Sequence, residues 1–173
     1  MSASAETSKD VFRWMGRFLL GHKRVVYSFS FQRAEGIEAY SDTDWSGCPR
    51  IRKSTKGGCI MIGSHCIRSW SSTQPSVTVS SGEAEYYGLV KAAGAGLGHQ
   101  ALMRDLGFDL PVTAWTDSGA ALGVASRSGF GKLRHLETSQ LWVQAKVADG
   151  ILKICKVDGK HNRSEEHTSE LQS

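Results

Sequence analysis

The apolar positions near the start of the chain predict a helix followed by a strand. Between residues 11 and 19 apolar side chains recur at the spacing of one helix face. Asp10 is placed to cap this helix, and Gly21 is placed to end it. From Arg24 to Gln32 apolar residues alternate in the manner of a strand. We therefore expect a helix and a strand that lead into the main part of the chain.

Three strand-like segments follow, rich in apolar and β-branched residues. They span Ile37–Asp42, Gly58–Ile62 and Cys66–Ser71. A polar loop over residues 48–56 separates the first two, and a Gly-Ser pair at positions 63 and 64 joins the last two in a tight turn. This pattern predicts three consecutive antiparallel strands.

The second half of the chain alternates helical and strand patterns. Ser80, Ser81 and Glu83 form a helix-start signal, and an Ala- and Leu-rich run continues to about Leu106. The later elements are expected at Val112–Thr116 (strand), Ser118–Ser126 (helix), Thr138–Ala148 (helix) and Ile151–Val157 (strand). Three antiparallel strands followed by these αβ units predict a mixed five-stranded sheet flanked by helices, an α/β or α+β fold.

Composition narrows the class of protein. The 173 residues are 40% hydrophobic and 22% charged with only 3 Pro, which excludes a disordered chain and favours one domain with at most an appendage. There is no apolar run long enough to span a bilayer and no signal-peptide pattern. We expect an intracellular protein without a membrane partner. The four cysteines form no CxxC pair, so we interpret them as core residues.

Three carboxylates stand at the ends of predicted elements. Asp42 ends the first strand, Glu85 lies in the first turns of the long helix, and Asp117 follows the next strand. Strand ends of an α/β sheet meet at one edge, where three acids would need a hard divalent cation such as Mg²⁺ or Mn²⁺. The same residues also suit helix caps and turns. Spacing alone leaves both interpretations open.

Five motifs occur in a fixed order along the chain. They are YSDTDWSGC (Tyr40–Cys48), RKST (Arg52–Thr55), SWSSTQPSV (Ser69–Val77), SSGEAEYYGL (Ser80–Leu89) and WTDSGAALG (Trp115–Gly123). Together they resemble the ribonuclease H domain of copia-type retrotransposon Pol polyproteins. The resemblance implies a ribonuclease H-like fold over residues 36–162. It also implies that residues 1–35 are the tail of the preceding reverse transcriptase region.

The resemblance also implies a chemistry. Asp42, Glu85 and Asp117 match the family's catalytic, metal-binding carboxylates, and Asp44 and Glu83 are their nearest competitors. Two Mg²⁺ (or Mn²⁺) ions would serve hydrolysis of the RNA strand of an RNA/DNA hybrid during reverse transcription. The implied partners are the hybrid and the reverse transcriptase region of the same polyprotein. The implied location is a cytoplasmic virus-like particle, the nucleus, or both.

The chain departs from the family pattern at its end. The family continues into a segment that carries a fourth carboxylate and opens a last helix, whereas this chain stops matching at Asn162. The string RSEEHTSELQS over residues 163–173 resembles a translated sequencing-library adapter, so we expect a non-native tail without that helix. Asp158 is a poor substitute for the fourth acid. A catalytically impaired module that binds the hybrid or serves a structural role is therefore the alternative; an integrase-like transferase would show Asp, Asp, Glu order.

Basic and polar residues mark a nucleic-acid interface in the same regions. His135 matches a Lys-His position of the family and is a candidate auxiliary proton carrier. The tentative contacts to phosphates or 2′-hydroxyls are Arg50, Arg52, Lys53, Ser54, Ser81 and Arg134. Loop charges of this kind are equally typical of a solvated surface, so the sequence leaves their role open.

Overall fold

The computed structural model describes residues 3–21, 24, 26–45, 52–129 and 138–163, and it divides the chain into two compact units. The first unit, Met1–Phe31, contains helix α1 (Ala3–Gly21). The expected helix and its end at Gly21 are confirmed. Asp10 does not cap it, because the helix begins upstream and Asp10 instead pairs with Arg13 at 3.6 Å on the helix surface.

The strand expected at residues 24–32 does not form. Within this stretch the described residues have no regular secondary structure, and Val26, Tyr27, Phe29 and Phe31 are exposed. Alternation of side chains indicates a strand only where a neighbouring strand accepts its hydrogen bonds. None of the described strands pairs with this segment.

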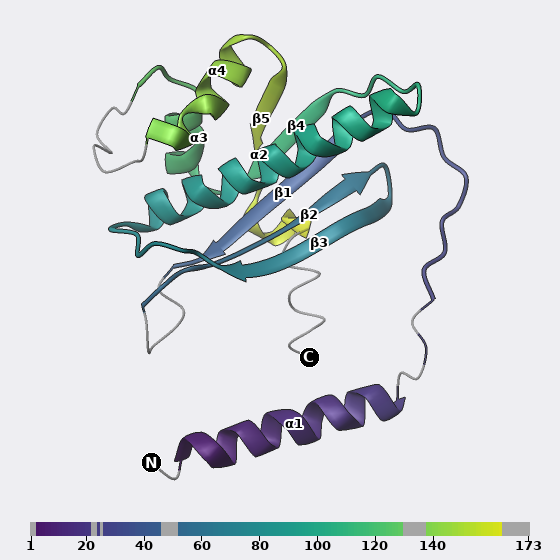
Figure 1. Ribbon diagram of the computed structural model, residues 1–173, viewed down its shortest axis with the longest axis vertical. Coiled ribbons are helices and arrows are strands. Elements are labelled where there is room, and N and C mark those ends of the chain that lie inside the picture. The colour runs from purple at the N-terminus through teal and green to yellow at the C-terminus, as the bar shows by residue number, and fades with distance from the viewer. Residues whose placement is uncertain (1–2, 22–23, 25, 46–51, 130–137, 164–173) are drawn as a thin grey trace. The chain divides into compact units, whose positions relative to one another are not determined.

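The second unit, Gln32–Ser173, is built on a five-stranded mixed sheet, as expected (Figure 1). Its strands are β1 (Ile37–Asp44), β2 (Thr55–Ile62), β3 (His65–Thr73), β4 (Val112–Thr116) and β5 (Leu152–Lys156). The order across the sheet is β3-β2-β1-β4-β5. The first three strands are antiparallel, whereas β4 is parallel to both β1 and β5. The carboxyl ends of β1 and β4 therefore lie at the same edge of the sheet.

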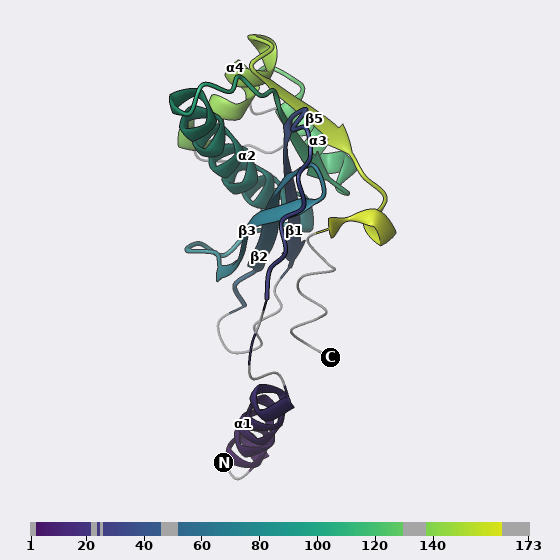
Figure 2. The same ribbon diagram turned by 90° about the vertical axis from the view of Figure 1, so that its right-hand side faces the viewer.

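Helices flank this sheet. The long helix α2 (Ser81–Asp105) runs along one face, and the shorter helices α3 (Gly119–Ala125) and α4 (Trp142–Ala148) follow β4 (Figures 1 and 2). Single 3-10 turns occupy Thr138–Gln140 and Gly159–His161. The helix expected over residues 138–148 is thus split into a 3-10 turn and α4. In the described part of the chain, no helix has both the length and the apolar character needed to cross a membrane.

The core lies between α2 and the sheet. Apolar residues of β1 and β4 face the small and aliphatic side chains of α2, and Ile37, Ala39, Leu89 and Ala114 are fully buried. Gly96 lets the helix approach closely: a Cβ there would lie 2.8 Å from Val112 Cγ1. Because this contact fixes α2 against β1 and β4, it also fixes the amino-terminal end of α2 relative to the edge where those strands end.

Candidate active site at the edge of the sheet

The structure brings Asp42, Glu85 and Asp117 together. Asp42 lies in the carboxyl-terminal half of β1, Glu85 near the amino-terminal end of α2, and Asp117 directly after β4. One carboxylate oxygen from each lies within 4.8 Å of the other two, and all three side chains are half-buried. The parallel pairing of β1 and β4 and the crossing of α2 produce this juxtaposition. We call these three residues the carboxylate cluster.

Hydrogen bonds between neighbouring residues hold the cluster's elements in place. Ser41 Oγ donates to the Trp115 carbonyl at 3.2 Å and links β1 to β4. Thr43 Oγ1 donates to the Ala84 carbonyl at 3.4 Å and links β1 to α2. Ser80 caps α2 by accepting a hydrogen bond from Glu83 N at 3.2 Å. Asp42 and Glu85 therefore each lie beside a tethered backbone position, and Asp117 lies two residues after one.

The cluster is electrostatically unbalanced. Burial raises the pKa of Glu85 to about 8, and the charges of Asp117 and then Asp42 add to this shift. Burial and the neighbouring Asp117 also raise the pKa of Asp42. Neither ion pair found among the described residues involves the cluster, and Glu85 Oε2 is buried with no hydrogen-bond partner there. Three facing carboxylates with an unpartnered oxygen fit a hard divalent cation with oxygen ligands.

The competing acids lie outside the cluster. Asp44 is exposed, and its charge only adds to the raised pKa of Asp42. Glu83 is buried and accepts a hydrogen bond from Val79 N at 2.8 Å, which makes it part of the helix start. Asp158 is exposed and lines a cavity of about 540 Å³ together with Asp117. Of the acids weighed from the sequence, the structure therefore groups the three preferred ones.

The predicted nucleic-acid contacts divide into four groups. Arg52 and Ser81 are exposed and available for contact. Ser54 is fully buried and hydrogen-bonded to Thr78 Oγ1 at 3.2 Å, so its prediction as a surface contact is wrong. Lys53 Nζ donates to the Pro75 carbonyl at 2.5 Å and ties two loops together. The remaining candidates, Arg50, Arg134 and His135, lie outside the described residues.

Asn162 is a site neighbour that the sequence reasoning missed. Its side chain is 1% exposed, and Nδ2 donates to the Ser41 carbonyl at 2.9 Å, one residue before Asp42. The contact ties the segment after β5 to the strand that carries the first carboxylate. Asn162 is the last residue that matches the family pattern, but that match does not indicate a contact with β1, so only the structure could reveal it.

Comparisons with known proteins show which proteins this chain resembles. No family model matches the chain. The chain is 31% identical over 125 residues to the retrovirus-related Pol polyproteins from transposons RE2 and RE1 of Arabidopsis thaliana. That match covers 70% of this chain but 8% of each polyprotein. An uncharacterized mitochondrial protein of the same plant, AtMg00810, is 45% identical over 58 residues, 33% of this chain and 24% of that protein.

Solved structures show the same fold. LC11-RNase H1, isolated from compost by a metagenomic approach, is 23% identical with a TM-score of 0.52, and the match covers 76% of this chain and 91% of that one. Its structure in complex with an RNA/DNA hybrid is 22% identical with a TM-score of 0.50, over 75% and 91% of the two chains. At these identities the likeness shows the arrangement of strands and helices.

Proposed function

We propose that this chain, which is homologous to a segment of retrotransposon Pol polyproteins and has a ribonuclease H-like fold, is a metal-dependent nuclease that cleaves the RNA strand of an RNA/DNA hybrid. The observation that carries the proposal is the carboxylate cluster: three half-buried acids within 4.8 Å of one another. Buried like charges of this kind are retained at functional sites because a bound cation resolves their repulsion. The homology to polyproteins and the hybrid complex of LC11-RNase H1 support the choice of substrate.

The cluster's residues fit divalent ions by their chemistry. Asp42, Glu85 and Asp117 would hold Mg²⁺ or Mn²⁺, and two ions are proposed. When bound, such ions activate water and stabilise the departing oxygen of an in-line displacement. In the proposed hydrolysis the water oxygen bonds to phosphorus while the bond from phosphorus to the 3′ oxygen breaks. The products are a 5′-phosphate and a 3′-hydroxyl.

The protein's own residues orient the carboxylate oxygens and set their affinity for protons. Asp42 is held by β1, whose neighbours on both sides of it are tied to β4 and α2. Burial and the charges of Asp117 and Asp42 raise the pKa of Glu85 to about 8, so a bound cation would favour the charged form of Glu85 that can act as a ligand. The fold thus presents a preformed set of oxygen ligands at the edge of the sheet.

A second candidate is a module that binds the hybrid without cutting it. It is favoured by one observation: Asp158, the substitute considered for the family's fourth carboxylate, is exposed and outside the cluster. In either case the proposed partners are the hybrid and the reverse transcriptase region of the same polyprotein, in an intracellular setting. The two candidates differ only in catalysis.

Cleavage of an end-labelled RNA/DNA hybrid by the purified full chain in Mg²⁺ or Mn²⁺ tests the proposal. We expect metal-dependent cutting of the RNA strand that Asp42→Asn abolishes. Asp44→Asn is the matched control, because Asp44 lies in the same strand but is exposed and outside the cluster. Folded wild-type protein that binds the hybrid without cutting it would support the binding module instead.

A further inference from the structure

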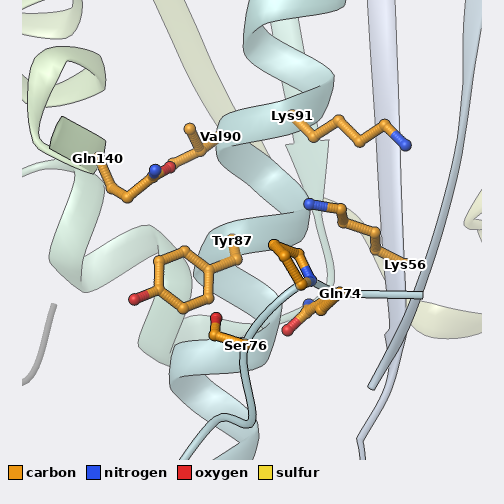
Figure 3. Close-up of a pocket in the computed structure, with 8 residues that line it drawn as sticks. Lys56, Gln74, Ser76, Tyr87, Val90, Lys91 and Gln140 are labelled. Carbon is orange, nitrogen blue, oxygen red and sulfur yellow. The ribbon is translucent and has the colours of Figure 1, made fainter. Parts of the chain in front are cut away.

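A groove is lined by residues of β2, of the segment between β3 and α2, of the amino-terminal half of α2 and of the 3-10 turn at Gln140 (Figure 3). Its volume is about 290 Å³. The lining contains two lysines and several neutral polar groups but no acidic residue: Lys56, Gln74, Pro75, Ser76, Tyr87, Val90, Lys91 and Gln140. We call it the lysine groove.

Lys56 and Lys91 give the groove its charge. Lys91 extends from α2 toward the sheet, and Lys56 extends from β2 toward the helix (Figure 3). Lys91 Nζ donates to Ser72 Oγ at 2.6 Å and lies 5.6 Å from the centroid of the Trp70 ring. An ammonium group has three donors, so this arrangement fixes Lys91 and leaves donors for a ligand. Neither lysine takes part in the ion pairs found among the described residues.

The walls of the groove are fixed by hydrogen bonds. On one side, Gln74 Nε2 donates to the Ala84 carbonyl at 2.9 Å, and Gln74 N donates to the Ser54 carbonyl at 2.7 Å. On the other side, Tyr86 Oη donates to the Gln140 carbonyl at 2.9 Å. The groove is therefore preformed, and binding would require little reordering of its walls.

Burial and mutual repulsion disfavour the charged forms of the two lysines. Burial lowers the pKa of Lys56. Burial also lowers the pKa of Lys91, and the charges of Lys56 and then Arg68 add to the effect. An anion between the two lysines would favour their charged forms and offset the repulsion.

The position of the groove selects the kind of anion. Lys91 follows Glu85 by six positions in α2, which places it about 9 Å along the helix axis, and its side chain leaves the helix about 120° away from that of Glu85. A nucleic-acid strand advances by about 3.4 Å per nucleotide, so it covers this distance in about three nucleotides. Lys56 lies opposite Thr43, the residue after Asp42. Gln74 of the groove donates to the Ala84 carbonyl, one residue before Glu85, so the groove and the cluster adjoin at this turn of α2. A hybrid bound at the cluster is therefore long enough to bring a backbone phosphate to the lysines.

We propose that the lysine groove binds the sugar-phosphate backbone of the nucleic acid whose reacting phosphate lies at the carboxylate cluster. The proposal rests on the proposed function for the position of the strand. The lysines contribute affinity without base specificity, because they contact phosphates only.

The test measures binding without cleavage. The probe is a fluorescently labelled RNA/DNA hybrid, and its anisotropy is titrated with the full chain in EDTA at several salt concentrations between 50 and 200 mM. We expect Lys56→Gln and Lys91→Gln each to weaken binding by roughly five- to ten-fold at the lower salt concentrations. Each should also reduce the slope of log affinity against log salt by about one. Lys153→Gln, an exposed lysine on β5 remote in the sheet order from β2, is the matched control and should change neither quantity.

Lys91→Arg guards against loss of folding, because it keeps the charge and should keep the salt slope. Unchanged affinity and slope in both glutamine variants would overturn the proposal, as would an equal loss in Lys153→Gln. Competition by poly-glutamate as effective as competition by poly-uridylate of equal charge would overturn the assignment to nucleic acid. Because EDTA removes catalysis from the measurement, lysine-dependent binding by a chain that never cuts RNA would refute the proposed nuclease alone.

Discussion

The carboxylate cluster and the lysine groove both bring like charges together in half-buried positions. Each gathers half-buried groups of one sign, and neither includes an ion pair among those the described residues form. Burial raises the pKa of Glu85 and lowers the pKa of Lys91, so burial disfavours the charged form in both regions. The acids converge within 4.8 Å, which suits a small ion, whereas the lysines flank a groove of about 290 Å³, which suits a larger anion. The difference in spacing is what we expect of a proposed metal site and a proposed site for the nucleic-acid backbone.

The two regions share a wall. Thr43 follows Asp42 in β1, lies opposite Lys56 in β2, and donates to the Ala84 carbonyl of α2. Gln74 of the groove donates to that same carbonyl. Because one carbonyl anchors both regions, a local disturbance there should affect both, whereas removing a charge should affect one.

The largest effect is expected from Asp42→Asn. Loss of a central ligand should reduce hybrid cleavage by about 10²- to 10³-fold, on the scale of other losses of electrostatic stabilisation in active sites. In EDTA the same variant should bind the hybrid slightly more tightly, since it removes a negative charge from the binding face. Rates from single-turnover cleavage and affinities from anisotropy check the two halves. Weaker binding by Asp42→Asn would contradict the separation of the two regions.

The free energy of unfolding should depend on both pH and Mg²⁺, because both act on the carboxylate cluster. The folded protein favours protonated Glu85, with a pKa of about 8 against an ordinary value of 4.5. The folded state therefore binds more protons than the unfolded state between these values, so metal-free stability falls as pH rises from about 4.5 to 8. Mg²⁺ at 100 times its Kd should restore about 2.7 kcal/mol. The gain in thermal midpoint should be large at pH 8.5 and small at pH 5.

Glu85→Gln is the control for this pH dependence. It replaces the titrating carboxyl by a neutral amide of the same shape, so the metal-free variant should lose less stability than the wild type between pH 5 and 8.5. Its response to Mg²⁺ should also be smaller. An identical fall in both proteins would show that Glu85 does not set the pH dependence.

The sequence predicted the framework of these regions better than their surroundings. The strand Val112–Thr116 and the helix start at Ser80 were predictable because periodicity and capping are local signals. The meeting of Asp42, Glu85 and Asp117 followed from topology once the strands were ordered. Ser54 was misjudged because a hydroxyl in a polar loop looks the same in sequence whether it faces water or Thr78. Residues 24–32 were misjudged because alternation does not supply a partner strand.

The lysine groove shows the limit of a loop-by-loop interpretation. Lys56 ends the polar loop predicted over residues 48–56, although it lies in β2, and Lys91 lies inside the apolar run of a long helix. Nothing in their separate contexts links them. Their proximity depends on how α2 crosses the sheet, which the sequence specifies only through small residues such as Gly96.

Gly88→Ala should disturb both regions at once. A Cβ at position 88 would lie 2.5 Å from Thr43 Oγ1, so Thr43 must shift and its link to α2 must weaken. We expect a loss of about 2 kcal/mol in unfolding free energy, as for overpacking of a buried site. Cleavage and salt-dependent binding should both decline. Thr43→Ala in the same chain removes the clashing oxygen and should recover part of the stability; failure to recover any would place the clash elsewhere.

The smallest effect is expected from Gly98→Ala, in the same helix. An added Cβ at position 98 meets no atom within 4 Å, and the position is exposed. Alanine in a helix interior is favoured over glycine by about 0.5–1 kcal/mol, so the thermal midpoint should rise by about 1–4 °C. Cleavage rate and salt slope should stay at wild-type values. If strengthening α2 here altered either one, the cluster and the groove would depend on the helix as a whole. Unchanged function beside the losses in Gly88→Ala would assign the coupling to the shared wall at Thr43.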